Sequence, residues 1–202
     1  MAPDLLPRLI AATAATVAAH AEELTTLDQA IGDGDHGVNM KRGFDAIAAA
    51  AEEIGAQPLG GALQKAGMTL VMNVGGASGP LYGSLLMGLG KAAGQDGDPD
   101  IAAMLAEGVA AVKKRGKSEA GEKTMLDVLV PVLEALRAAE PEGQTAAARA
   151  AADRGLAATE DMLATKGRAS FLGERSVGHL DPGARSSALL VHAVCDVIEG
   201  KA

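Results

Sequence analysis

Apolar side chains recur at steps of three and four residues along most of the chain, which is the spacing that places them on one face of an α-helix. The clearest run predicts one long helix over residues 4–30. It comprises, together with Thr13, the residues Leu6, Ile10, Val17, Leu24, Leu27 and Ile31. No segment shows the convincing alternation of apolar and polar positions that indicates a β-strand.

Seven further helices are predicted by the same spacing and by the glycine- and proline-rich segments between them. Their approximate ranges are 39–54, 59–73, 80–93, 99–115, 124–139, 144–165 and 184–199. Pro131 lies inside one of them and predicts a kink, because proline removes a backbone hydrogen bond. Residues 94–99 are predicted to form a turn. We therefore expect an all-α fold, a barrel or bundle of eight antiparallel helices in a single domain over residues 1–202.

Four of the connections are rich in Gly, Asp, Ser, Arg and His, whereas connections in helical bundles are commonly short and unremarkable in composition. They join the first helix to the second, the third to the fourth, the fifth to the sixth and the seventh to the eighth. In an up-and-down arrangement these four connections lie at the same end. The sequence therefore predicts one site at one rim of the bundle.

Composition and charge exclude several classes of protein. The 202 residues are 48% hydrophobic, enough to bury a core, and carry 18 Lys+Arg against 26 Asp+Glu with three aromatic residues. Nucleic acid is not an expected partner, because the net charge of -8 opposes it and stacking platforms are scarce. No apolar run is long enough to span a membrane, and Asp4 and Pro7 argue against a signal peptide. The single Cys195 suits a reducing compartment, so we expect a cytoplasmic protein.

Three carboxylates follow one another closely at the end of the first helix, at Asp28, Asp33 and Asp35, and the last two alternate with glycines. Carboxylates brought together repel, and a hard divalent cation such as Mg²⁺ removes the repulsion. An EF-hand is a poor fit, because its twelfth position, counted from Asp33, is Phe44 rather than Glu. The alternative is an Asp-Gly turn whose carboxylates cap backbone amides.

The segment Gly75–Pro80 is a glycine loop that opens onto a helix. Free N–H groups, the positive end of the helix dipole and the Ser78 hydroxyl are typical of an anion site. The loop lacks the Walker A lysine, and it follows a helix rather than the strand of a Rossmann turn. The alternative is a tight connection between two helices.

The other two connections add an apolar slot at Met125, cations at Arg168 and Arg175, and a turn at Asp181. Together with the carboxylates and the glycine loop, these are the parts that a nucleoside polyphosphate requires. The alternatives are a core methionine, surface arginines and a helix cap. His36 adjoins the carboxylates and is a candidate to bond a phosphate or a metal-bound water. We expect His20 and His192, which lie within helices, to be structural or exposed.

Four motifs together resemble the nucleotide-binding L subunit (DhaL) of bacterial dihydroxyacetone kinases, and they follow one another over nearly the whole chain. They are Gly32–Met40, Gly75–Gly83, Lys123–Val128 and the pair Gly167–Ser170 and Gly178–Gly183. The departures are mild: Gly34 where some relatives carry Ala, and Phe171 in a place that can be Tyr. The resemblance implies a barrel of eight antiparallel helices with ADP or ATP and two Mg²⁺ ions at one end.

The resemblance also assigns roles to individual residues. Magnesium binding falls on Asp28, Asp33 and Asp35. Nucleotide binding falls on His36, Gly37, Val38, Asn39, Ala77, Ser78, Gly121, Val130, Arg168, Asp181, Pro182 and Gly183. No residue is expected to carry a phosphoryl group covalently, because metal ions and positioning suffice for transfer.

The resemblance implies a function and partners as well. In phosphoenolpyruvate-dependent members, ADP stays bound, a phosphocarrier subunit rephosphorylates it in place, and a third subunit presents dihydroxyacetone. The expected partners are these two subunits, a second copy in a homodimer and, in some relatives, a transcription factor. Two alternatives stay open: an ATP-dependent kinase subunit for another small ketose or polyol, and a nucleotide-state-dependent regulator of a transcription factor.

Overall fold

The computed structural model describes residues 4–93 and 99–201, which form ten α-helices, two 3-10 helices and no strand. The α-helices are α1 (Leu5–Ala19), α2 (Ala21–Ile31), α3 (His36–Ala49), α4 (Ala51–Gly55), α5 (Leu59–Asn73), α6 (Ser78–Ala92), α7 (Ile101–Gly116), α8 (Leu126–Ala138), α9 (Gln144–Ala158) and α10 (Pro182–Ile198). The 3-10 helices are η1 (Pro141–Gly143) and η2 (Arg168–Ser176). The predicted all-α class is confirmed.

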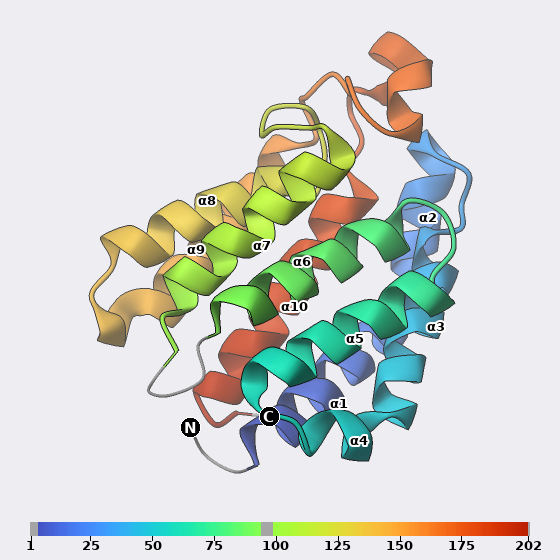
Figure 1. Ribbon diagram of the computed structural model, residues 1–202. Helices are drawn as coiled ribbons and strands as arrows, with labels where there is room; N and C mark the ends of the chain where they lie inside the picture. Colours follow the sequence, from blue (N-terminus) through green and yellow to red (C-terminus); the bar gives the residue numbers. More distant parts are fainter. Residues whose placement is uncertain (1–3, 94–98, 202) are drawn as a thin grey trace.

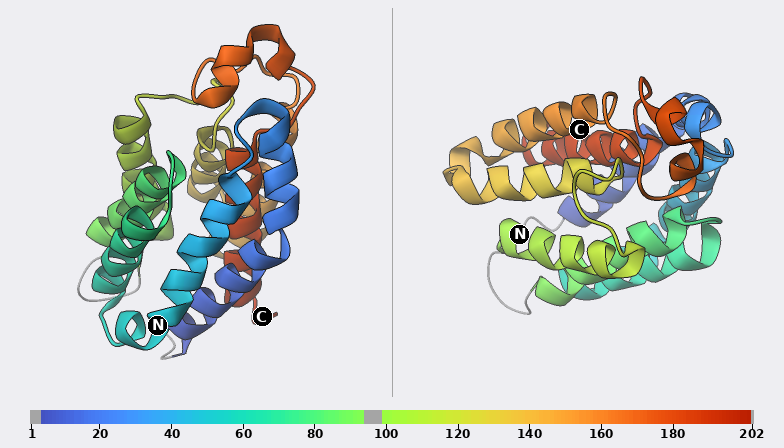
Figure 2. Two further views of the ribbon diagram at one scale, coloured as in Figure 1. Left: turned by 90° about the vertical axis from the view of Figure 1, so that its right-hand side faces the viewer. Right: turned by 90° about the horizontal axis from the view of Figure 1, so that it is seen from above.

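The helices close into a ring in which each packs against the next. Contacts run from α1 and α2 to α3, then through α5, α6, α7, α8 and α9 to α10, which packs back against α1. Figure 1 shows the helices running up and down, and the right-hand view of Figure 2 shows the ring from above. With α1 and α2 counted as one member and α4 as the end of α3, the ring has the eight members predicted.

Two of the predicted helices are interrupted. The helix expected over residues 4–30 breaks at His20, whose φ of -107° and ψ of 9° end α1. A new helix starts directly afterwards, with Glu22 and Glu23 in its first turn, where negative charge interacts favourably with the helix dipole. The helix expected over 39–54 begins earlier, at His36, and breaks at Ala50. Apolar spacing continues across both breaks, so the period alone did not reveal them.

Other boundaries differ by smaller amounts. The glycine-loop helix α6 starts at Ser78, before Pro80, so Ser78 is already helical. The helix expected to reach residue 165 ends at Ala158, and the segment after it contains η2. Pro131 lies within α8 as predicted. Most of the turn predicted at 94–99 lies outside the described residues.

Neighbouring helices in the wall formed by α5, α6 and α7 approach one another closely at glycine residues. A Cβ atom on Gly67 of α5 would lie 2.7 Å from the carbonyl oxygen of Gly83 on α6. Gly88 of α6 approaches the backbone of α7 at Gly108 in the same way. A real Cβ does not fit at such distances, so glycine at these positions sets the spacing of the helices.

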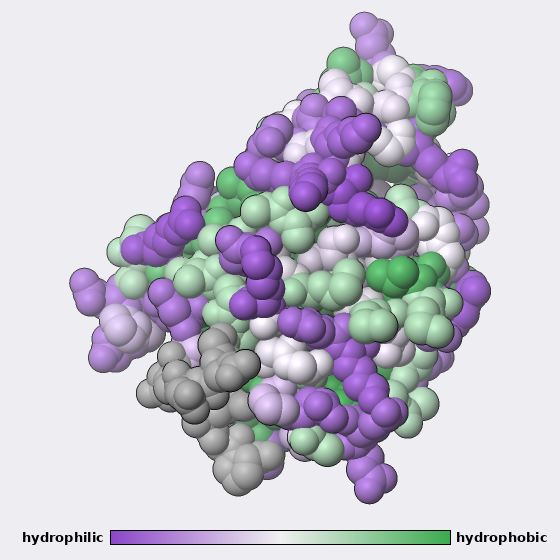
Figure 3. All heavy atoms as spheres, in the orientation of Figure 1, coloured by the Kyte–Doolittle hydropathy of each residue, from purple (hydrophilic) through white to green (hydrophobic). Residues whose placement is uncertain are grey.

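Apolar side chains are exposed on α5, among them Met68, Val71 and Met72. Figure 3 shows hydrophobic regions of this kind between hydrophilic ones on one face of the molecule. Among the described residues, no helix combines the length and the hydropathy that crossing a membrane requires.

Candidate functional site

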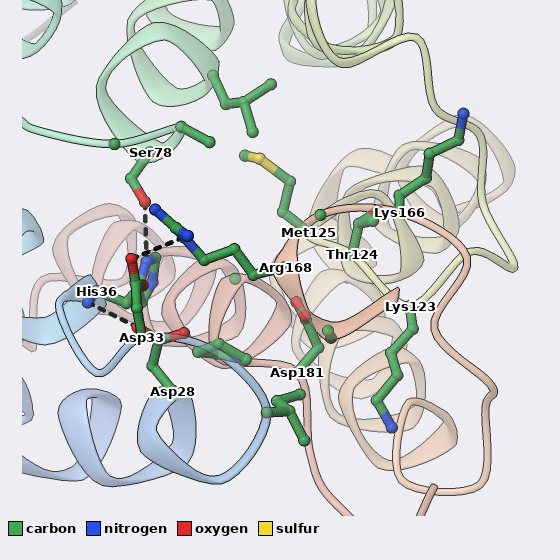
Figure 4. Close-up of a pocket in the computed structure, with 18 of the residues that line it drawn as sticks. Asp28, Asp33, His36, Ser78, Lys123, Thr124, Met125, Lys166, Arg168 and Asp181 are labelled. Carbon is green, nitrogen blue, oxygen red and sulfur yellow. Dashed lines mark hydrogen bonds and ion pairs between the residues drawn. The ribbon is translucent and has the colours of Figure 1, made fainter. Parts of the chain in front are cut away.

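The four polar connections meet at one end of the ring and line a single cleft, drawn in Figure 4. The carboxylate loop contributes Asp28, Asp33, Asp35 and His36, and the glycine loop contributes Gly76, Ala77 and Ser78. The loop before α8 contributes Lys123, Thr124 and Met125. The segment before α10 and the start of that helix contribute Lys166, Gly167, Arg168, Ala169, Asp181, Pro182 and Gly183. The site predicted from the order of the loops is therefore present as a geometric unit.

The carboxylates of Asp28, Asp33 and Asp35 converge, with one oxygen of each within 4.8 Å of the others. Asp28 is buried in the last turn of α2, and its Oδ2 accepts hydrogen bonds from the backbone N–H of Asp35 at 2.9 Å and of His36 at 3.1 Å. The carboxylate of Asp28 thus caps the loop and also points toward the cluster. The two interpretations of this loop, a metal site and a turn whose carboxylates cap backbone amides, are therefore compatible. The all-oxygen donor set suits Mg²⁺.

Arg168 reaches this cluster from the opposite side of the cleft. Its Nε lies 2.7 Å from Oδ2 of Asp33, and the ion pair is partly open to solvent. Figure 4 shows the guanidinium lying between the carboxylates and Ser78. Arg168 begins η2, which packs against α2, so the segment before α10 spans the mouth of the cleft.

The glycine loop places the start of α6 at the cleft. Gly76 has a φ of 65°, which glycine adopts without strain, and Ala77 is the N-cap residue. The first-turn N–H groups of a helix have no partner within the helix and carry its positive partial charge. Because Ser78 and these groups lie beside the carboxylates, an anion and a cation can be held next to each other.

His36 uses both ring nitrogens inside the protein. Nδ1 lies 2.9 Å from the Ser78 hydroxyl, and Nε2 lies 2.8 Å from the Ser186 hydroxyl. In a neutral imidazole one ring nitrogen donates and the other accepts, and here each of them has a hydroxyl group as its partner. Burial lowers the pKa of His36, which favours this neutral ring. The ring therefore fixes the position of Ser78, a role that was not predicted from the sequence.

Tyr82 and Asp181 fix the start of α10 beside the cleft. The Tyr82 hydroxyl lies 2.7 Å from Ser186 Oγ and 2.9 Å from Ser187 Oγ, and burial raises the pKa of Tyr82 to about 12. Asp181 is the N-cap of α10, since its Oδ2 accepts from the Ala184 N–H at 2.7 Å. Burial raises the pKa of Asp181 to about 7, with the charge of Asp127 adding to the rise.

Lys123 lies at the edge of the cleft with its ammonium directed away from the carboxylates, as Figure 4 shows. The residue is 1% exposed, and Nζ donates to the carbonyls of Thr159 at 2.7 Å and Met162 at 3.1 Å. Burial lowers the pKa of Lys123. Lys123 lies in one of the sequence motifs, but no role could be predicted for it, because its partners are distant in the sequence.

Five residues assigned to the nucleotide do not line the cleft. Gly37 packs against Ala21 and Thr25 of α2, and Val38 lies in a shallow groove on the outer side of α2 and α3. Asn39 is buried and accepts from Arg42 at 2.8 Å. Val130 packs against the core, and Gly121 lies in the loop before α8 with its N–H bonded to Asp127.

Of the two arginines that the sequence offered as cations of the site, one lines the cleft and the other is a surface residue. Arg168 belongs to the cleft, whereas Arg175 is an exposed cation outside it. Met125 is both core and cleft, because it is 4% exposed and still lines the opening. His20 and His192 are bonded to Glu23 and Asp153, in line with the structural role expected for them.

Comparison with known proteins gives a family and several relatives. Residues 30–196 match the DAK2 domain. The chain is 49% identical over 173 residues to the PEP-dependent dihydroxyacetone kinase 1, ADP-binding subunit DhaL, of Listeria innocua, covering 85% of this chain and 84% of that one. It is 41% identical over 205 residues to the D-erythrulose kinase of Mycolicibacterium smegmatis, covering 96% of this chain but 35% of that protein.

A solved structure has the same fold. The dihydroxyacetone kinase of C. freundii in complex with AMP-PNP and Mg²⁺ superimposes with a TM-score of 0.78 at 26% identity. The match covers 97% of this chain and 34% of that chain, so this chain spans about a third of that protein's length.

The family match includes most of the residues that line the cleft, from Ile31 to Gly183, and extends over far more than half of the chain. The residues that match the family therefore form most of the helical ring and most of the cleft at its rim. On this evidence the chain belongs to the DAK2 domain family.

Proposed function

We propose that this chain is the ADP-binding subunit of a phosphoenolpyruvate-dependent dihydroxyacetone kinase. It holds ADP or ATP with two Mg²⁺ ions and passes a phosphoryl group to dihydroxyacetone bound on a partner subunit. One observation carries the proposal: three converging carboxylates, a helix N-terminus and Arg168 share one cleft in a chain 49% identical to such a subunit.

In this proposal Asp28, Asp33 and Asp35 hold the magnesium ions, which neutralise charge on the β- and γ-phosphate oxygens. The first-turn N–H groups of α6 and the Ser78 hydroxyl bind the phosphates, and Arg168 supplies a further positive charge. Asp181, Pro182 and Gly183 form the far wall of the pocket, with His36 holding Ser78 in place. Phosphoryl transfer then depends on position and charge rather than on a covalent intermediate.

Five of the residues assigned to nucleotide binding do not line the cleft, so their proposed roles differ from those above. The side chain of Val38 lies outside the cleft and Gly37 has none, so we propose that Gly37, Val38 and Asn39 contribute through their backbone at the start of α3. Gly121 and Val130 belong in this proposal to the part of the pocket that receives the base.

The proposed partners are a dihydroxyacetone-binding subunit and a phosphocarrier subunit. Engagement of both ring nitrogens of His36 supports the idea that the phosphoryl group is not carried covalently in this cleft. One domain over residues 1–202, a cytoplasmic location, a homodimer and an interaction with a transcription factor are further parts of the proposal, and they rest on the sequence.

Reconstitution tests the proposal. The chain is mixed with a dihydroxyacetone-binding subunit and given either ATP or phosphoenolpyruvate with the phosphotransferase proteins. We expect phosphoenolpyruvate to support turnover with a single equivalent of bound ADP. Turnover with free ATP alone would contradict the recharging of bound ADP, and no turnover with either donor would contradict the kinase assignment.

A second candidate is an ATP-dependent kinase activity on another small ketose, and the 41% identity to a D-erythrulose kinase favours it. The acceptor is expected to lie on another domain or subunit, so the cleft described here does not select it. Comparing dihydroxyacetone with erythrulose as acceptor, with each candidate partner subunit in turn, distinguishes the two.

A further inference from the structure

Lys123 combines two features that are unfavourable on their own. The side chain is almost fully buried, at 1% exposure, and burial of an ammonium group requires hydrogen-bond partners. Its backbone has a φ of 62°, a conformation that residues other than glycine rarely adopt. Such a combination persists only where surrounding contacts impose it, and these conformations cluster at functional sites.

The ammonium of Lys123 holds the beginning of the segment that carries Arg168. This rim segment, residues 159–181, leaves α9 at Thr159 and enters α10 at Asp181. Nζ donates to the carbonyls of Thr159 and Met162. The carbonyl of Glu122, the residue before Lys123, accepts a hydrogen bond from the N–H of Thr165 at 3.3 Å. The first turn of the rim segment is therefore bonded to the loop before α8.

The same contacts reach the other end of the rim segment. Thr159 is fully buried, and its Oγ1 accepts from the Asp181 N–H at 3.1 Å while donating to Leu156 at 2.7 Å. The N–H of Gly178 bonds to the carbonyl of Glu160 at 2.8 Å. The two ends of the rim segment thus meet at the residues that Lys123 holds.

The loop that carries Lys123 is itself fixed to α8. Asp127, in the first turn of α8, accepts from the N–H of Thr124 at 2.6 Å and from the N–H of Gly121. A continuous set of bonds therefore runs from α8 through Lys123 to the rim segment. Arg168, nine residues beyond Thr159, is the part of that segment that reaches Asp33.

We propose that Lys123 is a positioning residue that fixes the rim segment so that Arg168 and Asp181 face a bound nucleoside diphosphate. The inference rests on the proposed function, because it assumes that the cleft takes such a ligand. The ammonium itself makes no contact with the ligand. It acts through Thr159 and Met162, and it sets nucleotide affinity through the placement of the rim segment.

Lys123→Met tests the inference, since methionine keeps most of the buried volume and removes the charge and the donors. Ile54→Val is the control for destabilisation, because Ile54 is 1% exposed in α4, at the end of the ring away from the cleft. Lys114→Met, on the exposed surface of α7, controls for the loss of one positive charge. ADP–Mg²⁺ affinity is measured by calorimetry, and amide exchange is followed across residues 159–181.

We expect Lys123→Met to weaken ADP–Mg²⁺ binding at least about tenfold and to speed amide exchange within the rim segment, while both controls stay within about twofold of the wild type. In the reconstituted kinase the KM for nucleotide rises, and kcat at saturating nucleotide changes less than about threefold. Lys123→Arg, which keeps a cation and donors, recovers part of the affinity. If Lys123→Met does not fold, Thr159→Val, which removes the bond to Asp181, takes its place with the same expectation.

Unchanged ADP affinity in a folded Lys123→Met protein overturns the inference and leaves the proposed function intact. An equal loss of affinity in Ile54→Val also overturns it, because the effect is then general destabilisation. A wild-type chain that binds no ADP with Mg²⁺ overturns both.

Discussion

Asp28, Asp33 and Asp35 place three negative charges close together, and Arg168 compensates only one of them directly. Like charges at this separation raise one another's free energy in the absence of a cation. A divalent cation relieves this repulsion and provides a positive surface for a diphosphate. The cation and the nucleotide should therefore bind as one unit, each raising the affinity for the other.

Replacing Asp33 with Asn removes one negative charge and one strong ligand from this unit. We expect Mg²⁺-dependent ADP affinity to fall by at least the roughly 10- to 100-fold that even outer-shell substitutions cause at metal sites. Asp45→Asn, an exposed carboxylate on α3 paired with Lys41, is the matched control and should bind as the wild type does. Equal ADP retention in Asp33→Asn and Asp45→Asn would contradict a role of the carboxylate cluster in binding Mg²⁺ and ADP.

Arg168→Ala should change metal and nucleotide binding in opposite directions. Without the guanidinium, Asp33 is free of a competing cation, so Mg²⁺ alone should bind up to about fivefold more tightly, as expected for a partly exposed ion pair. ADP–Mg²⁺ should bind about 10- to 100-fold more weakly, because a charge-assisted hydrogen bond is lost. Calorimetric titrations with Mg²⁺ alone and with ADP–Mg²⁺ measure both, and changes of the same sign would contradict the proposed role.

Asp181 should make the stability of the ligand-free protein depend on pH. Its pKa is raised from 3.8 to about 7, so the folded state binds more protons than the unfolded chain between these values. The free energy of unfolding therefore falls as pH rises across this interval and levels off above about pH 7. About three pKa units correspond to a loss of up to about 4 kcal/mol.

Asp181→Asn keeps the helix cap and removes this titration, since an amide oxygen can still accept from Ala184. Urea unfolding of both proteins between about pH 4.5 and 7.5 checks the prediction. The free energy of unfolding of the wild type should decline more steeply than that of the variant. Parallel pH profiles would show that Asp181 titrates near its ordinary pKa.

The sequence revealed the residues whose chemistry is local and missed those whose partners are distant. Spacing alone pointed to the carboxylates, and the glycine loop pointed to Ser78. Lys123, Tyr82 and Ser186 were given no role, because their partners lie far along the chain, as in the bond from Lys123 to Thr159. A lysine or a tyrosine that bonds to a distant residue carries no local sequence signal that distinguishes it from an exposed one.

Helix positions were predictable because apolar spacing reports which face is buried, and α5 was predicted at the bounds observed. Breaks at His20 and Ala50 were not, since a short irregular turn keeps the apolar stripe on the same side. The close packing of α5 on α6 was also missed. Glycine in a helix reads as an unfavourable residue until a neighbouring backbone is seen to require it.

Gly67→Ala should disturb this packing, because the added methyl group meets the carbonyl of Gly83 at 2.7 Å. We expect a loss of about 1–3 kcal/mol in the free energy of unfolding, as for other overpacked sites. Gly61→Ala in the same helix is the control, since its nearest neighbour lies at 3.4 Å, and alanine there should stabilise by about 0.5–1 kcal/mol. Thermal and urea unfolding measure both, and equal stability of the two variants would contradict the close contact.

The whole molecule derives its site from the ring. Because neighbouring helices alternate in direction, every second connection lies at the same rim, and the four polar connections are those. This arrangement was predictable from the order of the loops. The closure of α10 against α1 was not, because it joins segments from the two ends of the chain; Ser186 of α10 contacts His36, and Asp181 lines the same cleft.

The most direct test of the account is the mass of the native protein in the gas phase. After removal of bound ligands, the chain is measured with Mg²⁺, with ADP and with both together. The account predicts that ADP is retained, together with the mass of two magnesium ions, only when Mg²⁺ is supplied with it, because Asp28, Asp33 and Asp35 would hold the cations that offset the charge of the diphosphate. A chain that keeps its bare mass in the presence of both, or that binds ADP equally well without Mg²⁺, would contradict it.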